Sequence, residues 1–224
     1  MSVFPMRGAR PGVFGPLARG LAGVDVLAVQ LPGHGRRLRE EPLTSVSDIV
    51  RGLAPAVAAA VDGPYVVIGH SMGGLVGVEL VRALQDEHGP EHFIVSACRA
   101  PCELKDGQSW HRLPDDDLVA ALISLGADPA PLAVQELREL ALPALRAGLQ
   151  AVESFDKSPR PKVRCPITAI SGTEDPDAKP ELMAGWERET AGGFRAEVVA
   201  GGHFLLEERP DDMVGIVRDV LHGR

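Results

Sequence analysis

The sequence predicts an α/β fold in which a mainly parallel sheet carries helices on both faces. Short runs rich in apolar and β-branched residues alternate along the chain with longer segments of helical character, and Gly, Pro and Asp mark the turns between them. The predicted strands are residues 2–5, 24–31, 65–68, 93–98, 165–171 and 194–200. The predicted helices are residues 13–21, 49–61, 75–84, 113–125, 180–190 and 210–221, with one or two more over 132–155.

One stretch interrupts this alternation. No strand is predicted from residue 101 to residue 160, which is more chain than a single crossover needs. Long insertions at strand ends often cover an active site, so we expect a helical lid here within a single domain of residues 1–224. Elsewhere Thr44 or Ser45, with Asp48 following, predicts a capped start for the helix over 49–61, whose middle Pro55 should disturb.

The composition limits the classes of function. The 224 residues are 45% hydrophobic and 24% charged, which suits one globular domain. No apolar run approaches the length needed to cross a bilayer and the start lacks the layout of a signal peptide, which predicts a cytoplasmic protein. A formal charge of −8 argues against non-specific nucleic-acid binding. The three cysteines form no C-x-x-C pair, so we expect free thiols and no metal site. We also expect no cofactor.

Residues 69–73 read G-H-S-M-G, directly after the strand over 65–68 and before a helix. Strand, G-x-S-x-G turn and helix are the context of a nucleophile elbow, in which glycines make room for a strained serine. Ser71 is therefore the predicted nucleophile.

A serine nucleophile needs a base and an acid, and two later strand ends supply them. His203 follows the last strand, and Asp175 lies in the acidic turn after the preceding one, with Asp177 as the alternative acid. The chain order Ser, Asp, His is the one used by α/β-hydrolases. We expect the other histidines to be hydrogen-bonded surface residues, and His70 to point away from the nucleophile.

An oxyanion formed at Ser71 would need two backbone donors. The N–H of Met72 follows the nucleophile, and the second donor should come from the loop after the first strand, from Met6 or Arg7.

The chain resembles the type II thioesterases, α/β-hydrolases that accompany polyketide and nonribosomal peptide synthetases. The matching motifs are F-P-M-R-G-A at 4–9, L-P-G-H-G-R-R-L at 31–38, G-H-S-M-G-G at 69–74, E-L-R-E-L-A-L-P-A-L-R-A at 136–147, G-T-E-D-P at 172–176 and G-G-H-F at 201–204. The resemblance implies hydrolysis of acyl thioesters on the phosphopantetheine arm of acyl or peptidyl carrier proteins. It also assigns nucleophile, acid and base to Ser71, Asp175 and His203.

The sequence departs from the family pattern at its start. Relatives usually have a His-Ala-Gly-Gly loop where this chain has M-R-G-A at 6–9, and they carry more residues before it. We therefore expect altered geometry at the second oxyanion donor and a start that lacks upstream residues.

Two other functions fit the same motifs. One is a small-molecule carboxylesterase, because the same triad attacks oxygen esters. The other is a non-catalytic module that binds carrier proteins.

Acyl carriers are generally acidic, so the basic run Arg36, Arg37 and Arg39 is the candidate docking site, with Arg7 and Arg10 as the alternative.

Overall fold

A single parallel sheet organises the molecule. The computed structural model describes residues 2–6, 14–107 and 109–223. Its strands are β1 (Ser2–Met6), β2 (Asp25–Val26), β3 (Tyr65–His70), β4 (His92–Ser96), β5 (Ile167–Gly172) and β6 (Phe194–Val199). All neighbours are parallel in the order β2-β1-β3-β4-β5-β6, which confirms the predicted sheet. The chain order reverses between β1 and β3, and in open α/β sheets ligands bind at such a switch point.

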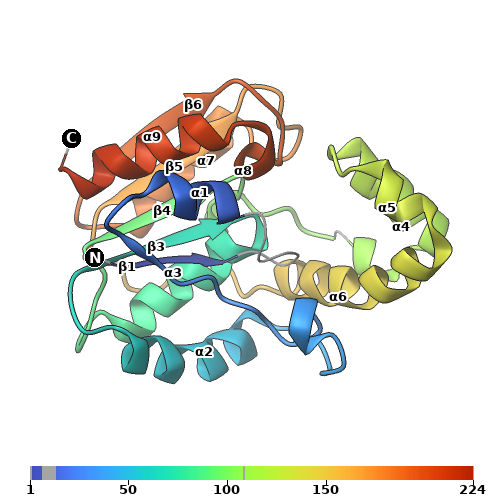
Figure 1. Ribbon diagram of the computed structural model, residues 1–224, viewed down its shortest axis with the longest axis horizontal. Helices are drawn as coiled ribbons and strands as arrows, with labels where there is room; N and C mark the ends of the chain where they lie inside the picture. The colour runs from blue at the N-terminus through green and yellow to red at the C-terminus, as the bar shows by residue number, and fades with distance from the viewer. Residues whose placement is uncertain (1, 7–13, 108, 224) are drawn as a thin grey trace.

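Helices cover both faces of this sheet (Figure 1). On one face lie α1 (Gly15–Gly20), α8 (Leu205–Glu208) and α9 (Pro210–Leu221), and on the other α2 (Val46–Ala60) and α3 (Met72–Leu84). Side chains of β3 alternate between the two, with Val66 and Ile68 packing toward α9 and Val67 toward α3. This double burial explains why β3 is apolar throughout.

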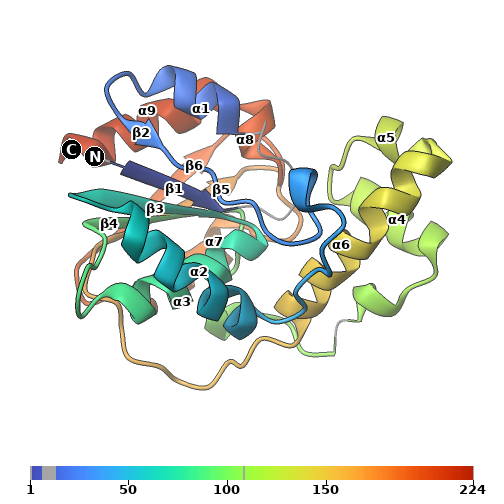
Figure 2. The ribbon, with the colours of Figure 1, turned by 60° about the horizontal axis from the view of Figure 1, so that its bottom comes forward.

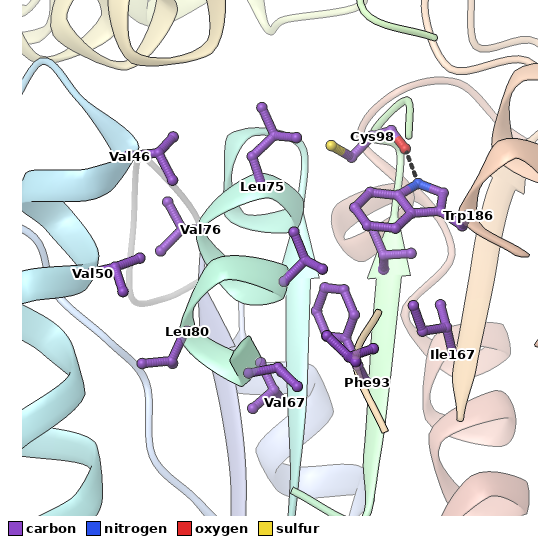
Figure 3. Close-up of a cluster of buried hydrophobic side chains, with 14 of the residues drawn as sticks. Val46, Val50, Val67, Leu75, Val76, Leu80, Phe93, Cys98, Ile167 and Trp186 are labelled. Atoms are coloured by element: carbon purple, nitrogen blue, oxygen red, sulfur yellow. Dashed lines mark hydrogen bonds between the residues drawn. The ribbon is translucent and has the colours of Figure 1, made fainter. Parts of the chain in front are cut away.

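The core on the α3 side is continuous from α2 to the far strands. Figure 3 shows Val46 and Val50 facing α3, and Trp186 standing beside β4 and β5. Trp186 belongs to η5 (Ala184–Glu189), which follows α7 (Pro180–Met183), so the helix predicted over 180–190 is one α-helical turn continued as a 3-10 helix. Its indole N–H donates to the Cys98 carbonyl at 2.7 Å, which satisfies the polar atom of a fully buried ring.

The insertion between β4 and β5 is helical, as predicted. After the short η3 (Pro101–Glu103) and η4 (Trp110–Arg112) it forms α4 (Asp115–Ser124), α5 (Pro129–Ala133) and α6 (Gln135–Glu153). These helices extend to one side of the sheet and have a small apolar core of their own (Figures 1 and 2). None of the described helices is both long enough and apolar enough to cross a bilayer.

Two local predictions are wrong. The strand expected over 24–31 is only β2, because after Val26 the chain leaves the sheet edge and Leu27 is already exposed. Ser45 does cap α2, accepting from the Asp48 N–H at 3.1 Å, but Pro55 does not break that helix. Pro55 is exposed, so water can satisfy the carbonyl group that lacks an intrahelical donor.

Candidate active site

Ser71 stands at the junction of β3 and α3 in strained geometry. Its backbone has φ 53° and ψ −128°, in the positive-φ region that side chains rarely adopt. A Cβ placed on Gly69 would lie 2.2 Å from the Gly73 carbonyl oxygen, so only glycine fits two residues before the serine. The reason predicted for that first glycine is confirmed.

Three side chains from three strand ends form one hydrogen-bonded chain. Ser71 Oγ lies 3.0 Å from His203 Nε2, and His203 Nδ1 lies 2.9 Å from Asp175 Oδ2. The other oxygen of Asp175 accepts the backbone N–H groups of Asp177 and Ala178 at 2.8 and 3.0 Å. Since a carboxylate only accepts, Nδ1 of His203 carries the hydrogen and Nε2 is left to accept from the serine hydroxyl.

The environment keeps Asp175 ionised. Burial by itself would raise the pKa of Asp175, but the hydrogen bond and charge of His203 and the two backbone N–H groups outweigh it, and the pKa lies below its ordinary value. Because the folded-state pKa is depressed, the ionised Asp175 carboxylate stabilises the folded protein at pH values above the ordinary carboxyl pKa. This stabilisation is lost as the pH falls through the lowered value.

The alternative acid has a different partner. The Asp177 carboxylate accepts from Arg99 Nη2 at 2.9 Å and lies 3.6 Å from Lys105 Nζ, and the structure gives it no bond to His203. The Arg99 side chain is buried, so this ion pair ties the acidic turn to the segment after β4. Sequence reasoning missed this pairing, because nothing in the spacing of the two residues indicates that they meet.

Close backbone packing brings the acid and histidine loops together. A Cβ on Gly172, the last residue of β5, would lie 2.4 Å from the carbonyl oxygens of both Gly201 and Gly202. The loop is also held by Glu208, whose carboxylate accepts the Gly202 N–H at 2.7 Å. His203 is therefore fixed by contacts on both sides.

The expectation that the remaining histidines lie on the surface is right for His88 and His222, which are exposed. It is wrong for His70 and His92. His70 is fully buried, its Nδ1 lies 3.1 Å from Ser96 Oγ, and its ring is 5.7 Å from that of His203. His92 bonds Thr168 Oγ1 at 2.9 Å, and burial, with a smaller effect of Arg195, lowers its pKa to about 4. The available signal was that His70 ends a strand buried on both faces.

The predicted oxyanion donors lie on both sides of the switch point. The backbone of Met72 begins α3, at the end of a helix where N–H groups lack intrahelical partners. Met6 ends β1 and pairs in register with Gly69, so it adjoins the elbow. Arg7 falls outside the described residues.

An apolar chamber of about 400 Å³ lies next to the loop that carries His203. Its wall combines the insertion helices, the loop over residues 33–38 and the start of α8, and its leucines are Leu38, Leu122, Leu132, Leu137, Leu140 and Leu145. Phe204 joins the chamber to the triad, because it lines the wall while its ring lies 5.3 Å from that of His203, edge to face. A serine hydrogen-bonded in this way near such a chamber could accept an apolar acyl group.

The predicted docking arginines border this chamber. Arg36 is exposed, whereas Arg37 is paired with Glu40 and donates to the Gln30 carbonyl at 3.0 Å. Both lie in the 3-10 turn η2 (Gly35–Arg37), between chamber-lining Gly35 and Leu38.

Comparison with known proteins identifies the family. The model of the thioesterase domain family matches residues 1–221. The chain belongs to the thioesterase family. The thioesterase PikA5 of Streptomyces venezuelae is 36% identical over 88% of this chain and 72% of its own length.

Solved structures of thioesterases resemble this chain in both sequence and fold. RedJ, the thioesterase of the prodiginine pathway in Streptomyces coelicolor, has a TM-score of 0.89 and 34% identity over 96% of this chain and 87% of its own. The type II thioesterase BorB from the borrelidin cluster has a TM-score of 0.86 and 35% identity over 97% and 90%. The resemblance to type II thioesterases and the α/β-hydrolase fold are thereby confirmed.

Proposed function

We propose that this thioesterase removes acyl groups from the phosphopantetheine arm of acyl or peptidyl carrier proteins, using Ser71, His203 and Asp175 as nucleophile, base and acid. The observation that supports it is the unbroken hydrogen-bonded chain from Ser71 Oγ to the Asp175 carboxylate, set in a strained elbow. The insertion of about residues 101–160 serves as the lid of the acyl chamber.

Each group in this hydrogen-bonded chain has one task. Ser71 Oγ attacks the thioester carbonyl while His203 Nε2 takes its proton, and the Asp175 carboxylate stabilises the imidazolium. Backbone N–H groups of Met72 and of Met6 or Arg7 bind the oxyanion. Collapse of the tetrahedral intermediate breaks the C–S bond, and the leaving thiolate takes the proton from His203. Water then attacks the acyl-serine by the same route and releases the free acid.

The test is a matched panel of substrates. One acyl group is presented on a carrier protein, on pantetheine and as an oxygen ester, and kcat/KM is measured for each. We expect the carrier thioester to be the best substrate, because binding energy away from the reacting bond contributes to the transition state. A preference for the oxygen ester would instead favour a carboxylesterase.

A second measurement separates enzyme from binding module. A serine-directed phosphonate should label the wild-type protein at Ser71 and leave Ser71→Ala unlabelled, because only an activated serine reacts quickly. If neither protein is labelled while carrier binding persists, the chain is a non-catalytic module.

Carrier docking is proposed to use the basic turn at the chamber rim. Arg36 is exposed and has no hydrogen-bond or ion-pair partner among the described residues, so its charge is available to an acidic partner. Arg37 already pairs with Glu40, so it contributes mainly by holding the turn.

A further inference from the structure

The polar side chains that line the acyl chamber offer it hydrogen-bond acceptors. Of the described residues that line it, three have polar side chains: His34, Asp128 and Glu207. Asp128 and Glu207 are carboxylates, and Asp128 accepts the Ala130 N–H at 2.9 Å. Among those lining residues no lysine, arginine, serine, threonine or tyrosine offers a donor.

His34 also presents an acceptor. The residue is only 9% exposed, and its Nδ1 lies 2.9 Å from the Pro32 carbonyl oxygen, so Nδ1 must carry the hydrogen. In the neutral ring Nε2 is then an acceptor. That atom is shielded from solvent and has no hydrogen-bond partner among the described residues. A buried polar atom of this kind is costly until a donor reaches it.

We propose that the chamber is selective for acyl groups that carry a hydroxyl or amino donor, and that His34 Nε2 accepts from that donor. The inference rests on the proposed function, because the donor arrives on the acyl part of the thioester. A plain alkyl chain fills the leucine-lined volume and leaves Nε2 without a partner. An acyl group with a donor fills the same volume and satisfies Nε2 once the His34 ring shifts toward the chamber, because the atom itself is shielded. Sites built to hydrogen-bond a substrate reject analogues that lack the group.

Two substitutions separate the two nitrogens of His34. His34→Asn retains an amide N–H where Nδ1 is, so it can still donate to the Pro32 carbonyl, but it has no atom at the position of Nε2. His34→Gln places an amide at the position of Nε2 and gives up the donor at Nδ1. A role in shaping the loop would make Gln the more damaging change, whereas a role in substrate recognition would make Asn so.

The experiment measures kcat/KM for octanoyl thioesters and for the same chain with a hydroxyl or an amino group at successive positions. Each acyl group is presented on pantetheine and on ethanethiol, which has no amide. We expect the wild type to favour the best donor-bearing chain by roughly tenfold. His34→Asn should bring that ratio near one, chiefly through loss on the donor-bearing chains, and His34→Gln should retain part of it.

Several results would overturn the inference. They are a wild-type preference for the plain chain, a ratio that His34→Asn leaves intact, and an equal loss on every substrate. A loss on all pantetheine thioesters but on no ethanethiol thioester would assign Nε2 to the amides of the arm instead. Failure of the proposed function is distinguishable, because the wild type would then hydrolyse no thioester at all.

Discussion

The elbow is closely packed, whereas the helical insertion is packed loosely. All six residues of β3 are buried, and α3 is buried along most of its length. In α6, by contrast, four of 19 residues are buried, and the chamber-lining Leu137 and Leu140 are 48% and 52% exposed.

This difference separates chemistry from selectivity. Close-packed elements hold side chains in one arrangement, which a triad needs, since small displacements of a reacting group are costly. Loosely packed helices with exposed leucines can adjust to acyl groups of different shape. Changes near the elbow should therefore alter turnover or folding, and changes in the insertion should alter the choice of substrate.

The largest expected effect is loss of the triad. Ser71→Ala and His203→Ala should each lower kcat by roughly four orders of magnitude or more, and Asp175→Asn should have a similarly severe effect, because triad members act as a unit. Stopped assays on one acyl-pantetheine thioester, with circular dichroism to verify folding, provide the measurement.

Asp177→Asn is the matched control for the acid. It weakens the pair with Arg99 but leaves the hydrogen bond that His203 donates to Asp175 in place, so kcat should fall less than tenfold. An inactive Asp177→Asn beside an active Asp175→Asn would reverse the assignment.

Glycine substitutions should show how closely the elbow is packed compared with an exposed helix position outside it. Gly69→Ala forces a Cβ against backbone and should reduce the free energy of unfolding by about 3 kcal/mol or prevent folding. Gly52→Ala, in α2, meets nothing within 4 Å and should stabilise by up to about 1 kcal/mol. Thermal unfolding of both variants measures the difference, and equal midpoints would contradict it.

The sequence was most informative where one local rule governs a residue. The apolar run of β3 and the G-x-S-x-G turn identify Ser71 because strand, turn and helix are all local. His203 and Asp175 were predictable because parallel strands end at the same edge. The strand over 24–31 was overestimated because β2 is an edge strand whose length depends on its pairing with β1.

The parts of the site that depend on contacts between distant segments could not be predicted. Arg99 and Asp177 lie far apart in the chain, and their pairing follows from the way the turn after β5 folds over the segment after β4. His34 lines the same chamber as the insertion helices, which no pattern in residues 31–38 indicates. His70 could have been recognised as buried, since it continues the strand.

Leucine truncations should separate stability from selectivity. Leu80→Ala removes a fully buried α3 side chain and should cost about 2–5 kcal/mol of unfolding free energy, with little change in kcat. Leu140→Ala should change stability by less than about 0.5 kcal/mol. It should lower kcat/KM by roughly threefold for long acyl chains and leave acetyl hydrolysis unchanged. Equal losses on acetyl and long-chain substrates would remove the chamber from acyl recognition.

The last expected effect concerns carrier docking at the chamber rim. Arg36→Glu should raise the apparent KM for an acyl carrier by roughly threefold to tenfold at low salt, and hydrolysis of an acyl-pantetheine should not change, because an exposed charge acts on encounter and not on the triad. The control is Arg164→Glu, an exposed arginine three residues before β5 and so at the opposite edge of the sheet, which should have no effect. Arg37→Glu should affect both substrates, since it also breaks the pair with Glu40 beside the chamber wall. If Arg36→Glu and Arg164→Glu behave alike, docking lies elsewhere, and the exposed face of α6 is the next surface to test.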